Sequence, residues 1–279
     1  MDGSRRTFLK TAGCVILGAG IDAPIVRAVA GAVSADATPG ELKAERWAMV
    51  VNVRKCLQRE GCRACIDACH VAHNVPLIKD PLHEIKWIWK EPFKNTFAAE
   101  SHPYLDNGLA GKPVLALCNH CDNPPCVRVC PTGATWKRSD GIVMMDQHRC
   151  IGCRYCITAC PYGARTFDFG EMYPGGEPGT GWGSVPSPEY GQFRVRDEHA
   201  SPVGNVRKCT FCLHLQDDKG QYNKAQGRWP ACAKTCPGEA IHFGDFKDPE
   251  SEVSQLIRSN NVIRLKEELG AEPNVYYLI

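Results

Sequence analysis

Sixteen of the chain's 17 cysteines fall into four groups of four, and their spacing could supply the ligands of metal clusters. The two central groups read Cys118-x2-Cys121-x4-Cys126-x3-Cys130-Pro131 and Cys150-x2-Cys153-x2-Cys156-x3-Cys160-Pro161. Three thiolates a few residues apart can cover one face of an iron–sulfur cube, while a fourth thiolate followed by proline ligates the other cluster of a pair. These two groups therefore predict a pair of 4Fe-4S clusters.

The two remaining groups depart from this spacing. They are Cys56, Cys62, Cys65 and Cys69 near the start of the chain, and Cys209, Cys212, Cys232 and Cys236 near its end. Extra residues follow Cys56, so this thiol reaches its cluster over a bulged loop or the cluster itself is altered. The sequence Cys-Pro-x-x-Ala recurs at Cys130, Cys160 and Cys236, which indicates duplicated modules.

Two histidines close to the first group have two possible roles. His70 stands where three of the groups have proline, and His73 follows three residues later. Imidazole is a common metal ligand, but a polar loop residue beside a cluster is the commoner role for histidine in this position. We therefore expect both histidines in loops, the cysteines as the iron ligands, and no catalytic residue.

Disulfides and structural zinc are the alternative uses of so many cysteines. Disulfides pair thiols across a fold and need no triplets followed by a fourth thiol and proline. Two Cys-x2-Cys knuckles suit zinc, yet a third thiol intrudes into each central group. A zinc-stapled structural protein without a redox role remains the rival function class.

The elements expected around the cysteines are short. Asp140-Gly141 supplies the positive φ of a tight hairpin turn. An alternating segment places Ile85, Trp87 and Trp89 on one face, either for partner docking or for burial in the chain's own core. The predicted strands are Trp47–Val53, Ile85–Lys90, Thr135–Arg138, Ile142–Asp146 and Asn274–Ile279, and an amphipathic helix is predicted over Glu250–Arg258.

The N-terminus has the pattern of a twin-arginine export signal. Arg5-Arg6 precedes a small-residue apolar run over 11–21 and a cleavage motif that ends at Ala30, with Cys14 as an apolar residue of the signal. The run is shorter than the ~20 residues of a membrane-spanning helix. This route exports proteins that are already folded and loaded with cofactors, so we expect a periplasmic protein. Without residues 1–30 the chain is neutral, which argues against nucleic-acid binding.

These motifs resemble those of the four-cluster ferredoxin-type iron–sulfur subunits of complex iron–sulfur oxidoreductases, such as polysulfide and dimethyl sulfoxide reductases. Within that family the chain looks most like the DsrO-type subunits of sulfite-reduction-associated DsrMKJOP complexes. The segments that carry the narrower likeness are the twin-arginine signal, His73-Asn74-Val75-Pro76, Glu84-Ile85-Lys86-Trp87-Ile88-Trp89, Cys118 to Cys126, and Glu272-Pro273-Asn274-Val275-Tyr276-Tyr277.

The resemblance implies an α+β fold of two ferredoxin-like bis-cluster modules related by pseudo-two-fold symmetry, with long loop insertions. It also implies four 4Fe-4S clusters with crossed ligation. The ligand sets would be Cys56, Cys62, Cys65 and Cys236; Cys209, Cys212, Cys232 and Cys69; Cys118, Cys121, Cys126 and Cys160; and Cys150, Cys153, Cys156 and Cys130.

The implied function is electron transfer without catalysis by this chain. The expected partners are an integral membrane quinone-interacting subunit of the NrfD/DsrP type and a multihaem cytochrome c or a catalytic subunit. The alternatives within the same class are subunits of polysulfide, tetrathionate or menaquinone reductases. The expected organisation is a signal peptide (1–30), a linker (31–45), an outer module (46–112 and 205–248), an inner module (113–169), a Gly/Pro-rich insertion (170–204) and a C-terminal helix and strand (249–279).

Overall fold

The computed structural model describes residues 46–73, 75, 78, 80–98, 109, 111–169 and 204–279. They belong to one compact unit, Leu42–Ile279. The predicted signal peptide and linker, and the Gly/Pro-rich insertion up to residue 203, lie outside the described residues. In the part that is described, no helix is both long and apolar enough to cross a membrane.

A four-stranded sheet joins the two ends of the described chain. Its order is β8-β1-β10-β9, with β1 parallel to β10 and the other pairs antiparallel. The strands are β1 (Trp47–Asn52), β8 (Ile241–Asp245), β9 (Val262–Arg264) and β10 (Val275–Leu278). A nearly continuous apolar run suits a strand that is buried on both faces, as β1 and β10 are. The strands predicted at Trp47–Val53 and Asn274–Ile279 are therefore confirmed.

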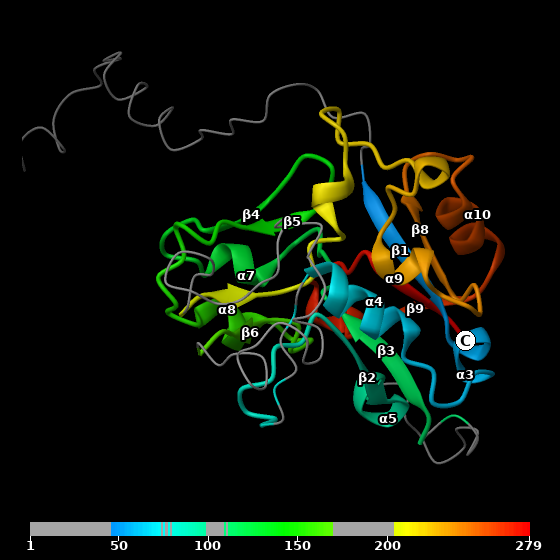
Figure 1. The fold of residues 1–279 in the computed structure, drawn as a ribbon, viewed down its shortest axis with the longest axis horizontal. Helices are drawn as coiled ribbons and strands as arrows, with labels where there is room; N and C mark the ends of the chain where they lie inside the picture. The colour runs from blue at the N-terminus through cyan, green and yellow to red at the C-terminus, as the bar shows by residue number, and fades with distance from the viewer. Residues whose placement is uncertain are drawn as a thin grey trace, which may run out of the picture. The chain divides into compact units, whose positions relative to one another are not determined.

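The two faces of this sheet have different partners. Val50 and Tyr276 pack against Val253 of helix α10 (Glu252–Ser259), which lies over β8 and β1 in Figure 1. Met49 and Tyr277 point into the larger core that also contains buried cysteines. One face of the sheet thus carries the helix predicted at the C-terminus, and the other supports the cysteine loops.

A second group of elements follows β1. It contains α3 (Val53–Leu57), α4 (Ala64–His73), β2 (Ile88–Pro92), α5 (Phe93–Thr96) and β3 (Pro113–Leu117). Strands β2 and β3 pair antiparallel, and Tyr277 of β10 donates a hydrogen bond to the Leu115 carbonyl at 3.0 Å. The strand predicted from Ile85 begins only at Ile88. Ile85 and Trp87 are buried in the chain's own core, which is one of the two roles left open for this segment.

The central cysteine groups lie among short elements that Figure 1 shows together. These are α7 (Pro125–Arg128), β4 (Thr135–Lys137), β5 (Val143–Met145), α8 (Tyr155–Ala159), β6 (Thr166–Phe167) and β7 (Val206–Arg207). The predicted hairpin is confirmed: β4 pairs with β5, and Gly141 in the turn has φ +85°. Strand β6 pairs with β7, so the segment after the insertion returns to the inner cysteine groups.

Short turns carry the last cysteine group. Three-residue helical turns occur at Leu213–Leu215 and Lys224–Gln226, between Cys212 and Cys232, and α9 covers Ala231–Lys234. A further three-residue turn, Glu267–Leu269, lies between β9 and β10. Helix α9 packs against α4, which brings the first and last cysteine groups together. The fold is a mixed α/β arrangement in which the sheet formed by both ends of the described chain lies beside the central cysteine loops.

Candidate metal centres

The eight central cysteines line two separate cavities. One cavity is lined by Cys118, Cys121, Cys126 and Cys160, and the other by Cys130, Cys150, Cys153 and Cys156. In each cavity, three cysteines come from one group and the fourth comes from the other group. We call these cavities site 3 and site 4.

The first and last groups are gathered in the same crossed manner. Burial raises the pKa of Cys65 to about 12, and the nearby thiols of Cys56, Cys236 and Cys62 contribute to this rise. Burial also raises the pKa of Cys69, and the thiols of Cys209, Cys212 and Cys232 contribute to this rise. We call Cys56, Cys62, Cys65 and Cys236 site 1, and Cys69, Cys209, Cys212 and Cys232 site 2. The cavity linings at sites 3 and 4 contain two of the four sets that the family resemblance implies. Ligation of a cluster by any of the four sets stays a prediction.

Short helices explain why each group serves two sites. Cys65 and Cys69 lie one turn apart in α4, so both thiols leave the same face of the helix. Cys232 lies in α9, and Cys236 lies just beyond its end. Because α4 packs against α9, Cys65 and Cys236 lie in site 1, and Cys69 and Cys232 lie in site 2. In the packed helices α7 and α8, Cys126 lines site 3 and Cys156 lines site 4. Cys130 and Cys160 lie just beyond the ends of α7 and α8, and each lines the opposite site.

Left-handed backbone turns shape the loops between the cysteines. His120, Gly152 and Phe211 have φ of +41°, +68° and +55°, each between two cysteines of one group. At Gly152, a Cβ atom would lie 2.2 Å from the Gly204 carbonyl oxygen. A side chain is therefore excluded at this position by both conformation and space.

Backbone and side-chain donors surround the sulfur atoms. The amide of Ala240 donates to Cys236 Sγ at 3.2 Å, and that of Phe211 to Cys209 Sγ at 3.4 Å. Burial opposes ionisation of Cys130, but the amides of Thr135, Thr132 and Ala134 and the Thr132 hydroxyl bring its pKa below the ordinary value. Donors to sulfur stabilise thiolate ligands.

Arg165 lies between sites 3 and 4. Its Nη2 donates to Cys126 Sγ at 3.2 Å and its Nη1 to Thr135 Oγ1 at 3.2 Å, and the residue is only 3% exposed. Burial acts to lower the pKa of Arg165, but the neighbouring Cys126 and Cys156 raise it above its ordinary value. The sulfur atoms of Cys126 and Cys156 therefore stabilise the charged form of this guanidinium.

Lys208 lies between sites 2 and 3. Its Nζ donates to the carbonyls of Val143 and of Cys209, the latter at 2.7 Å, and the residue is 2% exposed. Burial lowers the pKa of Lys208, while Cys118 acts in the opposite direction. Among the described residues, no carboxylate forms an ion pair with Lys208 or with Arg165.

The burial of Arg165 and Lys208 without a carboxylate partner among the described residues bears on whether the cavities suit an iron–sulfur cluster. A buried cation is costly unless a negative charge compensates it. Thiolate-ligated clusters are anionic, and their potential responds to nearby hydrogen bonds and charge, so a cluster in site 3 would compensate both residues. Four thiols around a cavity also suit a group several atoms across. Within the described residues, no three Cys, His, Asp or Glu side chains are placed to hold a single metal ion.

The sites follow one another in the order 1, 2, 3, 4. Cys65 of site 1 is among the thiols that, after burial, raise the pKa of Cys69 in site 2. His120, in the site 3 loop, stacks on Phe211, in the site 2 loop, with ring centroids 3.8 Å apart. Burial and then Cys126 of site 3 raise the pKa of Cys156 in site 4, although Arg165 opposes them.

The two ends of this series are the more exposed ones. All four cysteines of site 2 are buried, whereas Cys153 of site 4 is exposed and Cys56 and Cys62 of site 1 are partly exposed. Ile151 and Tyr155 beside site 4 are exposed apolar side chains at 68% and 63%. The series therefore runs from one partly exposed end through buried sites to another.

The two histidines lie elsewhere than predicted. His70 and His73 lie in α4 and are buried, so the prediction that they are loop residues is wrong. A helix that carries Cys65 and Cys69 on its buried face also buries the next turn. His73 Nε2 lies 3.1 Å from Cys212 Sγ, and its ring stacks on Trp87. Burial, with a smaller effect of Arg63, lowers the pKa of His70 to about 4.

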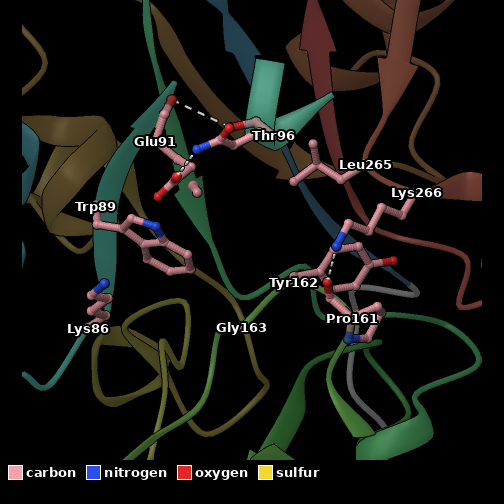
Figure 2. A pocket seen from close by; sticks show the side chains of 11 residues that line it. Lys86, Trp89, Glu91, Thr96, Pro161, Tyr162, Gly163, Leu265 and Lys266 are labelled. Atoms are coloured by element: carbon pink, nitrogen blue, oxygen red, sulfur yellow. Dashed lines mark hydrogen bonds between the residues drawn. The ribbon is translucent and has the colours of Figure 1, made fainter. Parts of the chain in front are cut away.

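A cavity without cysteines lies beside the Pro161 turn of site 3. Figure 2 shows Trp89, Tyr162 and Lys266 among its lining side chains. Lys266 Nζ donates to the Pro161 carbonyl at 2.6 Å, and Asn95 donates to Glu91 at 2.8 Å. The contact of Lys266 holds the site 3 turn against the C-terminal segment.

The sequence alone does not identify Lys208, Arg165 or His120 as residues of the sites, although Lys208 is adjacent to Cys209 in the sequence. Arg165 lies five residues after Cys160, and only the pairing of β6 with β7 brings Lys208 to the same site. The one available signal is the position of His120 inside a Cys-x2-Cys loop.

Comparisons with known proteins agree with this geometry. Residues 113–171 match the 4Fe-4S dicluster domain family. The chain is 44% identical over 242 residues to a subunit of the selenate reductase of Mesobacillus selenatarsenatis, covering 84% of this chain and 72% of the relative. It is 38% identical to the Hdr-like menaquinol oxidoreductase iron-sulfur subunit 1 of Archaeoglobus fulgidus, covering 98% and 97%. It is 32% identical to a subunit of the tetrathionate reductase of Salmonella typhimurium, covering 100% and 89%.

Proposed function

The chain belongs to the family of ferredoxin-type iron–sulfur subunits of reductase complexes and is an electron-transfer subunit with 4Fe-4S clusters, and from this premise we propose that it holds four of them in series. Sites 1 to 4 each take one cluster through their four cysteines. Sites 1 and 2 make one ferredoxin-like module and sites 3 and 4 make the other, and a pseudo-two-fold axis relates the two modules.

The order and burial of the sites carry this proposal. Neighbouring sites share a helix turn at Cys65 and Cys69, a ring stack at His120 and Phe211, and a guanidinium at Arg165. The middle of the series is shielded from water, and both ends reach toward the surface. When bound, the clusters supply one-electron transfer, which the chain's own side chains do not.

The residues of the chain hold the clusters, orient them and shield them from water. Thiolates fix each site, amides such as that of Ala240 donate to sulfur, and the buried Phe211 and partly buried Tyr162 exclude water between loops. Burial and then Cys121 raise the pKa of Tyr162, so its hydroxyl remains protonated beside site 3.

The exposed apolar side chains at site 4 support partner docking at that end. Val129, Ile151 and Tyr155 are exposed apolar side chains that are close in sequence to cysteines of site 4, and Arg128 and Arg149 are close to them in sequence. An apolar centre with a charged rim is typical of a protein interface. A redox subunit that docks here reaches the series without crossing the protein interior.

We place the chain between a quinone-reactive integral membrane subunit of the NrfD/DsrP type and a second redox subunit, a multihaem cytochrome c or a catalytic subunit. The name of the menaquinol oxidoreductase subunit, which the chain matches over nearly its full length, supports the quinone side. A DsrMKJOP-type complex on the outer face of the membrane is the specific assembly we propose, reached through the twin-arginine signal. The similarity to selenate and tetrathionate reductase subunits supports a second candidate, a subunit of an oxyanion reductase.

The test of this function is spectroscopic and biochemical. The protein, purified without oxygen, should be brown, lose its broad visible absorbance on reduction with dithionite, and show EPR signals of reduced 4Fe-4S clusters. A colourless protein that contains zinc would overturn the proposal. Affinity purification from native membranes should recover an integral membrane subunit; recovery of a selenate- or tetrathionate-type catalytic subunit would favour the second candidate.

A further inference from the structure

Two buried cations converge on site 3 from opposite sides. Arg165 approaches from the side of site 4 and bonds Cys126 Sγ. Lys208 approaches from the side of site 2, bonds the Cys209 carbonyl and also bonds the carbonyl of Val143, a residue that lines the site 3 cavity. Both residues are almost completely buried.

Neither cation has a carboxylate partner within the described part of the chain. Arg165 donates to Thr135, Met145 and Cys126, and Lys208 donates to two carbonyls. The residue next to Lys208 provides a contrast. Arg207 is equally buried, and Asp168 lies 3.0 Å from it. The fold thus pairs one buried cation with a carboxylate and leaves two beside site 3.

Among the side chains that the structure describes, sites 1, 2 and 4 each have fewer buried cations beside them than site 3 has. Lys208 also faces site 2, and Arg165 also faces site 4, so each of these sites has one of the two cations. Arg154 lines the site 4 cavity as well, but it is exposed and therefore more strongly screened by solvent. Site 1 has Lys90, whose Nζ bonds the Cys62 carbonyl and which is partly exposed. Because solvent screens an exposed charge more than a buried one, Lys90 acts more weakly.

We propose that Arg165 and Lys208 together give site 3 the highest reduction potential in the series, so that the added electron resides preferentially in the buried middle of the subunit. Reduction adds one negative charge to a site, and a cation in a low-dielectric interior stabilises that charge. Two cations at one site stabilise the reduced state more than one cation does. This inference depends on the proposed function, because it requires clusters in the sites.

The experiment is an EPR-monitored redox titration of the loaded full chain. Removal of a site 3 ligand in Cys121→Ser identifies the signal of site 3. Arg165→Met and Lys208→Met should each lower the potential of site 3, with at least a tenfold fall in the equilibrium constant for reduction, which is about 59 mV for one electron. Arg165→Met should also lower the reduction potential of site 4 but not that of site 2. Lys208→Met should lower the reduction potential of site 2 but not that of site 4.

Two variants separate charge from structure. Arg165→Lys keeps the charge and should restore most of the lost potential. Lys137→Met removes a cation that already pairs with Asp122 at 2.8 Å, beside Cys121, and should leave site 3 unchanged. If Arg165→Met fails to load iron, Arg165→Lys must still load and retain the high potential; failure of both overturns the inference.

The outcomes also distinguish this inference from the proposed function. Wild-type protein without cluster signals would overturn the function itself. Intact signals whose potentials do not respond to either substitution, or shift equally at all sites, would overturn only the role of Arg165 and Lys208.

Discussion

At the scale of single residues, Cys130 distinguishes two ways of sharing sixteen thiols among the sites. It lies in the cavity with Cys150, Cys153 and Cys156, although Cys126 is closer in sequence. We expect Cys130→Ser to damage the cluster of site 4 and leave site 3 largely intact, because a serine oxygen is a harder and poorer ligand for iron. Iron content and EPR signals measure the damage.

Double variants serve as the control for this prediction. Cys130→Ser combined with Cys153→Ser should damage one cluster, since both residues line site 4. The combination with Cys118→Ser should damage two. The reverse result would mean that each sequence group holds its own cluster.

The buried thiols also predict how loading depends on pH. Burial raises the pKa of Cys65 and of Cys209 to about 12, so without a cluster these thiols keep their protons throughout the neutral range. Ligation requires thiolates and therefore releases protons, so the loaded form binds fewer protons and is favoured as pH rises. At a fixed concentration of free iron and sulfide ion, occupancy should increase from about pH 6.5 to about pH 8.5. A constant or falling occupancy would contradict this.

At the scale of elements, the turn at Gly152 holds site 4 against the segment that returns at Gly204. Gly152→Ala puts a Cβ atom 2.2 Å from the Gly204 carbonyl oxygen at φ +68°, which combines strain with a backbone clash. We expect destabilisation of about 3 kcal/mol or more and selective loss of the site 4 cluster. Urea unfolding and iron content measure the two effects.

Gly133 is the matched control for this prediction. Its φ is +63°, but within the described part of the chain no heavy atom beyond its two chain neighbours lies within 4 Å of the Cβ position. Gly133→Ala should cost only about 1 kcal/mol, from the left-handed backbone alone. Equal effects of the two substitutions would show that the contact with Gly204 does not matter.

Elements with a strong local signal can be predicted from sequence, and those set by distant pairing cannot. Asp140-Gly141 and the apolar run from Trp47 specify the hairpin and the central strand locally. The helix around His70 is not predicted, because the cysteine spacing there does not reveal which face of the segment is buried. The positions of Arg165 and Lys208 depend on the two-residue pairing of β6 with β7 across a long insertion, which leaves no local pattern.

At the scale of the whole molecule, cluster loading and folding should be one process. The core is divided among short helices, two-residue strands and cysteine loops, and Arg165 and Lys208 would be buried cations without compensation if the sites were empty. Cluster binding then supplies folding free energy. Removal of iron with a chelator should abolish the cooperative thermal transition seen by calorimetry or circular dichroism. An iron-free form that melts like the loaded protein would refute this coupling.

The central claim is that four clusters lie in series in one chain. The most direct measurement is iron and acid-labile sulfide content together with EPR spin quantitation of the fully reduced protein. Four occupied sites predict about sixteen irons per chain and about four spins, with broadened signals because neighbouring sites interact magnetically. About eight irons with two isolated spins, or zinc in place of iron, would contradict the account.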